Sequence, residues 1–169
     1  ERAWLEDFDT VFVAHITRYG SIAATLQHVP GVRVEVSINW LTEEQLAAMH
    51  GTEGIPHHYH FARFERIALR RESGGTLTQA FTYATVMGCL SHDGAPVGLA
   101  EIRAEGRPHK SMSQHEIQDV VHGRLADGEA ADAFILSNIA DKDLRRAREL
   151  RLAADSHPFA WPNWERIEV

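Results

Sequence analysis

The sequence has little of three features that often assign a chain to a class. It has 169 residues but a single cysteine, Cys89, so no disulfide can form within the chain and a reducing compartment is the default. No apolar run approaches the roughly 20 residues that span a bilayer. Acidic residues outnumber basic ones by 24 to 17, and a net charge of −7 disfavours nucleic acid, which a basic surface would attract. We therefore expect a cytoplasmic protein with neither a membrane nor a nucleic-acid partner.

The sequence around Cys89 does not favour a nucleophilic cysteine. It lies within Val86–Leu90, where apolar neighbours would raise the pKa of a thiol rather than lower it. We interpret Cys89 as a packing residue.

The order of the expected elements indicates an α+β protein. The hydrophobic share of 44% and the charged share of 24% are ordinary for a globular chain, and we expect one domain over residues 1–169. Strands come first and helices later, which favours the α+β class. The expected strands are Thr10–Ile16, Val32–Ile38, Tyr59–Leu69, Thr76–Met87 and Val97–Ile102, with turns at Val29–Gly31, Ser73–Gly75 and Asp93–Gly94.

Two capping boxes give the clearest local signals. Thr42 is a good N-cap, and Gln45 three residues later can close the box. Ser113 and Glu116 repeat the device. We expect a helix after each cap. Residues 130–154 are also expected to be helical, with a break near Ala140. The aromatic tail that follows residue 154 should pack over the sheet without forming a helix or strand.

Glu53 occupies an unusual place for a carboxylate. The proline of Gly54–Pro56 should end the first helix, so Glu53 lies at its C-terminal end. The helix dipole is negative there, which disfavours a carboxylate and raises its pKa. This placement does not favour stability.

An ordered pattern covers about a third of the chain. It comprises a Gly-Ser-Ile-Ala-Ala-Thr-Leu strand, a Leu-Thr-Glu-Glu-Gln-Leu helix start, Glu53-Gly54 and then Tyr59. In this pattern the stretch Tyr19–Arg66 resembles the gamma-glutamylcyclotransferase family. The resemblance implies a mixed, barrel-like sheet with flanking helices, Glu53 as catalytic acid/base, Tyr59 in the pocket wall, and no metal or cofactor.

The implied reaction explains why one carboxylate suffices. A gamma-glutamyl amide carries its own nucleophile, the α-amine, close to the γ-carbonyl, so cyclisation to 5-oxoproline is intramolecular and positioning supplies much of the rate. One carboxylate can take a proton from the amine and return one to the leaving group. The resemblance thus predicts a lyase or acyltransferase that cleaves a small gamma-glutamyl-type amide.

The chain departs from the family in one loop. Family members have a Tyr-Gly-Ser-Asn loop whose backbone amides hold the glutamyl group, whereas Gly20 and Ser21 are followed by Ile22. We keep Gly20 and Ser21 as substrate-binding candidates, but the family's first strand and loop are missing from these residues. An upstream segment, a second polypeptide or a second copy could supply them, and such a partner would pair with an open edge beside Thr10–Ile16.

Histidines provide the remaining candidates. His115 and His122 lie two turns apart on one helix face, so His115 is a candidate substrate contact, with an exposed histidine as the alternative. His58 and His60, followed by Glu65, approximate one half of a cupin metal motif. The second half has no counterpart downstream, so we expect no metal.

Three functions stay open at this point. The first is the cyclotransferase-like enzyme, the second a non-catalytic binding or assembly module with the same fold, and the third a metal-dependent cupin-like oxygenase. The burial of Glu53 separates the first two, because a catalytic glutamate must face a pocket. Metal content separates the third.

Overall fold

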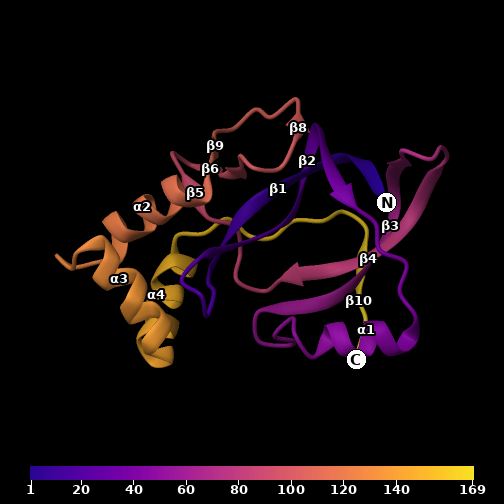
Figure 1. The fold of residues 1–169 in the computed structure, drawn as a ribbon. Helices are drawn as coiled ribbons and strands as arrows, with labels where there is room; N and C mark the ends of the chain where they lie inside the picture. Colours follow the sequence, from indigo (N-terminus) through magenta and orange to yellow (C-terminus); the bar gives the residue numbers. More distant parts are fainter.

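The protein folds around a large, mostly antiparallel sheet with four helices. The computed structural model describes residues 1–169 (Figure 1). The order β10-β3-β1-β2-β8 forms the main path of the sheet, with β4 paired to β3, and β7 to β1 and β9. Four long strands build most of it: β1 (Arg2–Ile16), β2 (Ile22–Ser37), β3 (Tyr59–Arg71) and β4 (Thr76–Thr85). The short strands are β5 (Ser91–His92), β6 (Ala95–Pro96), β7 (Gly98–Leu99), β8 (Ala104–Glu105), β9 (Ser111–Met112) and β10 (Trp164–Arg166).

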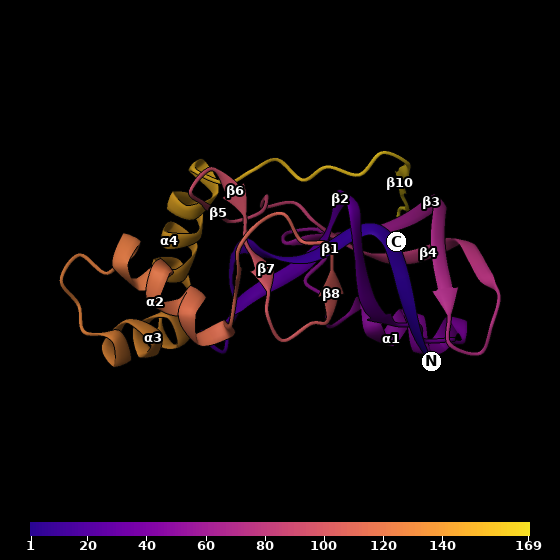
Figure 2. The same ribbon diagram turned by 90° about the horizontal axis from the view of Figure 1, so that it is seen from above.

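The helices lie at opposite ends of this sheet. α2 (Gln114–Leu125), α3 (Ala131–Ala140) and α4 (Lys142–Ala154) gather at one end, and α1 (Glu43–His50) lies at the other (Figures 1 and 2). None of the four is both long enough and apolar enough to cross a bilayer. The α+β class is confirmed. The strand pairings do not close into a barrel, so the barrel-like form of the sheet is not confirmed.

The strands β1 and β2 form one long ribbon with a bulge inside it. Glu6 pairs with Arg33 and Phe8 with His28, so β2 has extra residues opposite Asp7. Asp7 and Gly31 both have positive φ, and the Gly31 amide donates to Asp7 Oδ1 at 2.8 Å. The turn expected at Val29–Gly31 is therefore wrong. The glycine instead allows a β-bulge within a continuous strand.

The chain covers the edge of β1 that the sequence leaves open. Phe12 N–H donates to the Val97 carbonyl at 3.0 Å, and Ala14 N–H donates to that of Gly88 at 3.1 Å. Leu90 N–H in turn donates to the Phe12 carbonyl at 2.8 Å. The prediction of an unpaired edge beside Thr10–Ile16 is thus wrong, because residues from a distant irregular segment supply the hydrogen bonds of this edge.

Two hydrophobic clusters make up the core. The larger lies between the C-terminal half of β1 and helices α2–α4, and includes Phe12 and Ile16. The other lies at the α1 end and includes Leu5 and Phe8. β1 contributes to both. Cys89 is fully buried, and burial raises its pKa to about 12, which agrees with its interpretation as a packing residue.

Local signals set most element boundaries. Both capping boxes form as expected, with Thr42 and Ser113 as the caps, and Asp141 caps α4 at the expected break. Only Gly98–Leu99 of the strand expected at Val97–Ile102 is extended.

The tail differs from expectation. It runs along the sheet from α4 and pairs with β3 as the short strand β10 (Figure 2). Trp161 is buried on the way, and its indole N–H donates to the Leu26 carbonyl at 2.7 Å. The tail packs over the sheet as expected, but it also forms an element.

Candidate functional site

Glu53 lies in the turns that join α1 to β3. The helix ends at His50, earlier than the proline signal suggests, with Gly51 as its C-cap, and a series of turns leads on to Tyr59. The Glu53 side chain is half-buried there, and burial raises its pKa above the ordinary value of 4.5. The direction agrees with the sequence analysis, but its cause is loss of solvent rather than the helix dipole.

The charge of Glu53 acts on two tyrosines. Burial raises the pKa of Tyr59 to about 12, and the charges of Glu53 and Glu149 add to the effect. Burial and the Glu53 charge also raise the pKa of Tyr83. The Tyr83 hydroxyl is 2.9 Å from His50 Nδ1. Both phenols therefore stay protonated at neutral pH and can donate hydrogen bonds.

Tyr59 was expected to line the pocket, but Tyr83, which was not expected, is the tyrosine that lines the cavity beside α1. β3 and β4 pair Tyr83 with Phe61, two residues beyond Tyr59, so both tyrosines come to the same part of the sheet. Sequence alone does not give that register.

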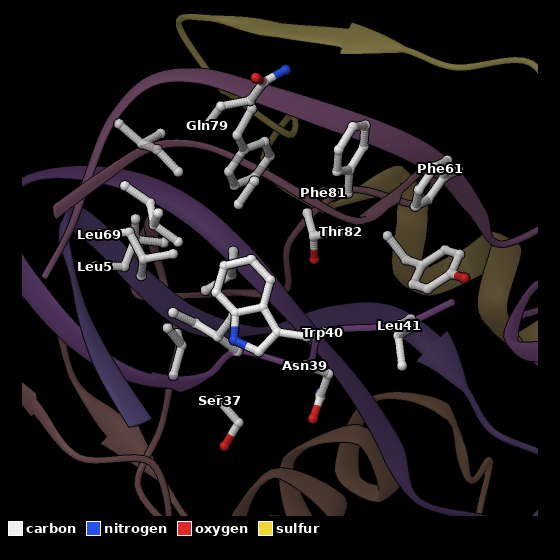
Figure 3. A pocket seen from close by; sticks show the side chains of 18 of the residues that line it. Leu5, Ser37, Asn39, Trp40, Leu41, Phe61, Leu69, Gln79, Phe81 and Thr82 are labelled. Carbon is white, nitrogen blue, oxygen red and sulfur yellow. The ribbon is translucent and has the colours of Figure 1, made fainter. Parts of the chain in front are cut away.

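An apolar cavity of about 560 Å³ opens next to Tyr83. Its walls come from α1, from the segment before it, and from strands β1 to β4 (Figure 3). Sixteen of its 20 lining residues are hydrophobic and none carries a charge at neutral pH. Leu46 and Met49, which the sequence places on one helix face, both line it. The volume lies within the usual range for ligand pockets.

A second polar group surrounds the buried carboxylate of Glu149 on α4. Its Oε1 lies 2.6 Å from His15 Nδ1 and accepts the Ile16 amide at 3.0 Å. Arg146 Nη1 approaches Oε2 at 3.4 Å, and His58 Nε2 lies 3.8 Å from it. Burial alone would raise the Glu149 pKa, but the His15 hydrogen bond and charge, with His58 and the Ile16 amide, hold it below 4.5. Glu149 thereby fastens α4 to the end of β1.

The donor set of His15, His58 and Glu149 could in principle hold a metal, since two histidines and a glutamate occur at catalytic zinc sites. Their donor atoms all lie within 4.8 Å of one another. The two imidazoles are tilted against each other, with centroids 3.9 Å apart and planes 33° from parallel. His15 Nδ1 and Glu149 Oε1 already form a hydrogen bond with each other at 2.6 Å. Burial and the neighbouring His15 charge lower the pKa of His58, and the neutral imidazole that this favours is the form that binds a metal.

The half-cupin motif is not assembled. His58 turns toward His15 and Glu149, whereas His60 lies within β3 with a buried Nδ1 that has no hydrogen-bond partner. Glu65 pairs with Arg63 at 3.2 Å.

Three predicted substrate contacts are not brought to Glu53. Gly20 lies in the β1–β2 turn against α3, where an added Cβ would come within 2.9 Å of Ile135. The Ser21 hydroxyl is 2.7 Å from that of Thr17. The His115 side chain is 86% exposed and faces Asp119. Each has a local structural role or faces solvent.

No family model, curated protein or solved structure matches this chain. Its chemistry must be inferred from the site itself.

Proposed function

We propose that this chain is a gamma-glutamylcyclotransferase-like enzyme in which Glu53 carries the proton. The observation that supports this is a half-buried carboxylate whose pKa is raised by burial, in the turns that follow α1, the helix that forms one wall of an uncharged cavity. Such a placement does not stabilise the fold, because burial penalises the charged form without a compensating partner. Perturbed carboxylates beside pockets are typical of acid/base sites.

The reaction needs one proton carrier. The α-amine of the substrate attacks the γ-carbonyl, a new C–N bond closes the five-membered lactam, and the original amide C–N bond breaks. Glu53 takes the proton that the attacking nitrogen loses and gives it to the departing amine. A raised pKa brings the carboxylate closer to the working pH, where both transfers are efficient.

Tyr59 is the candidate to stabilise the oxyanion. Its phenol stays protonated and lies near Glu53, so it can donate to the negative charge that develops on the γ-oxygen. This would replace part of what backbone amides do in the family's loop.

The test is Glu53→Gln, which keeps the shape but cannot carry a proton. Release of 5-oxoproline and of free amine from gamma-glutamyl amides should fall by about 10²-fold or more. Glu43→Gln and Glu44→Gln, exposed on the first turn of α1, are matched controls and should keep full activity. Undiminished turnover in the Glu53 variant would remove this residue from the mechanism.

A non-catalytic binding module is the second candidate. The placement of Gly20 against α3 and of Ser21 beside Thr17 favours it, because both residues have local partners in the β1–β2 turn. On this view the fold retains the cavity but lacks the oxyanion donors, or receives them from another polypeptide or a second copy. Absence of turnover in the unmodified protein, together with retained ligand binding, would favour this function.

A further inference from the structure

One long edge of the sheet has no partner. β4 pairs with β3 along one side, and no other strand pairs with it. No backbone hydrogen bond joins residues 77–84 to any segment other than β3. The other edge of β3, by contrast, is covered by β10 and by the start of β1. The second edge of β4 is therefore open along most of its length.

The hydrogen bonds of β3 show which backbone groups of β4 point outward. Val86 N–H donates to the His58 carbonyl at 2.9 Å, and this pair continues the β3–β4 register. Hydrogen-bonded pairs alternate along an antiparallel ladder, so the even-numbered residues of β4 bond to β3. The β10 side agrees, because Ile167 N–H donates to the Phe61 carbonyl at 2.9 Å and the odd-numbered residues of β3 thus face β10. The groups directed outward from β4 are those of Gln79, Phe81 and Tyr83.

The apolar cavity lies along this open edge. Residues 79–83 of β4, which are consecutive, all line it (Figure 3). Successive side chains of a strand point to opposite faces, so a cavity on one face would be lined by alternate residues only. A cavity that touches every residue must reach around an edge of the strand, and β3 fills the other edge. The cavity therefore borders the free backbone groups of β4.

Nothing in β4 blocks pairing with another strand. Thr76–Thr85 contains no charged residue and no proline. The one register shift of the β3–β4 ladder has its extra residues on β3, between Glu65 and Leu69. Residues 76–83 are all at least partly exposed, and Phe81 is 57% exposed. Edge strands that must stay unpaired usually carry lysine, proline or a bulge, and β4 has none of the three.

These features together describe one kind of ligand. N–H and C=O groups on alternate residues of a strand are matched by the backbone of a second extended chain. No lining residue carries a charge at neutral pH, so a charged side chain would lose its hydration there without gaining a partner. A hydrocarbon could fill the cavity, but it would cover the backbone groups of β4 without satisfying them.

We propose that the open edge of β4 binds an extended, uncharged peptide segment of another protein, which adds a strand to the sheet and places apolar side chains in the cavity. Backbone pairing supplies affinity, and the uncharged walls select the side chains. This interaction does not depend on Glu53 or on the reaction proposed above.

Calorimetric titration with a defined probe tests the binding. The probe is the capped peptide acetyl-Val-Thr-Phe-Thr-Leu-Thr-amide, which alternates apolar and uncharged polar side chains. We expect saturable binding, and an affinity at least about tenfold lower when glutamate replaces its phenylalanine. Equal affinities of the two peptides, or no saturable binding of the first, would overturn the proposal.

A pair of variants isolates the backbone contribution. Phe81→Pro removes one outward N–H and no hydrogen bond to β3, a placement that edge strands tolerate. Phe81→Ala also removes the ring but keeps the N–H, so it is the matched control. The proline variant should bind the probe about fivefold more weakly than the alanine variant. Circular dichroism would verify both folds, and equal affinities of two folded variants would contradict strand pairing.

Amide hydrogen exchange gives a second measurement that needs no substitution. Bound probe should slow exchange at Gln79, Phe81 and Tyr83 by at least about tenfold, because their N–H groups gain acceptors. The amides of Ala80 and Thr82 already bond to β3 and should change less. Unchanged exchange at the first three amides, with the probe bound, would overturn the proposal.

Sedimentation velocity of the protein alone separates a peptide partner from a second copy of this chain. A monomer that binds the probe would support the proposal. A dimer that Phe81→Pro dissociates, but Phe81→Ala does not, would overturn it by assigning the edge of β4 to a second copy.

Discussion

Helices α1 and α2 begin alike and end in opposite surroundings. Thr42 caps α1 and Ser113 caps α2, each in a complete capping box. α2 buries Ile117, Val121 and Leu125, whereas α1 buries no residue. A capping box thus decides where a helix starts, and its partners decide whether it contributes to the core.

The partners of the two helices explain the difference. α2 packs in the larger cluster with β1, α3 and α4, and Glu149 fastens that assembly to the strand. α1 faces β3 and β4 across a cavity. Helix α2 therefore contributes to a core cluster, whereas α1 contributes to none and leaves room for a ligand.

The largest expected effect is at Glu149. Glu149→Leu would leave the Ile16 amide and His15 without their acceptor, and should lower the free energy of unfolding by about 3–5 kcal/mol in urea titration. Glu43→Leu on exposed α1 is the control, with an expected loss below about 1 kcal/mol. A comparable loss in both would break the contrast between the two ends.

A pair of truncations comes next. Ile117→Ala in α2 removes fully buried methyl groups and should cost about 2–5 kcal/mol. Leu46→Ala in α1 should cost less than about 1 kcal/mol, because that side chain lines the open cavity. The same urea titrations measure both, and a large effect at Leu46 would mean that α1 belongs to the core.

Removing the caps should have a smaller effect. Ser113→Ala should lower global stability by about 1 kcal/mol, because α2 is coupled to the core. Thr42→Ala should act mainly on α1 itself, through faster amide hydrogen exchange over Glu43–His50 with little change in Tm. Equal shifts in Tm would contradict this.

Glu53→Gln should slightly stabilise the protein at neutral pH. Its folded-state pKa is raised, so the native state holds the proton more tightly and stability falls as pH rises above the unfolded value of 4.5. The variant should therefore have the higher Tm at pH 7, and the gap should close below pH 4.5. Glu43→Gln, at the exposed start of α1, is the control and should not raise Tm at pH 7, because it removes a carboxylate from the positive end of the helix. A lower Tm for the Glu53 variant at pH 7 would refute the destabilising burial.

The smallest expected effect is that of chelation. The cupin-like motif of His58 and His60 has no second half in the sequence, so EDTA should leave Tm and activity unchanged, and elemental analysis should find no stoichiometric metal. One transition metal per chain, lost in His15→Ala, would overturn this.

Local chemistry explains which features the sequence predicts. Both capping boxes, the turn at Ser73–Gly75 and the α4 cap involve residues within four positions of each other, and all form as expected. The raised pKa of Glu53 was also anticipated, though from the helix dipole rather than burial. The resemblance to gamma-glutamylcyclotransferases stays a prediction.

Long-range pairing explains what the sequence does not predict. His15, His58 and Glu149 come from three distant segments, and no spacing rule relates them. The two-residue spacing of His58 and His60 predicted that both would face the same side of one strand. In the structure His58 instead faces Glu149 of α4. Tyr83 comes to the α1 side of the cavity, beside His50, only through the β3–β4 register. Apolar positions such as Leu46 and Met49 look the same in sequence whether they will line a core or a cavity.

The shared strand β1 has a consequence for how the molecule comes apart. Leu5 and Phe8 belong to one core cluster and Phe12 and Ile16 to the other, on a single continuous strand. Neither cluster can melt without releasing side chains that hold the other, so thermal unfolding should proceed in one cooperative transition. The amides near the middle of β1 should be the last to exchange with deuterium, and limited proteolysis should not separate a helical fragment from an α1 fragment.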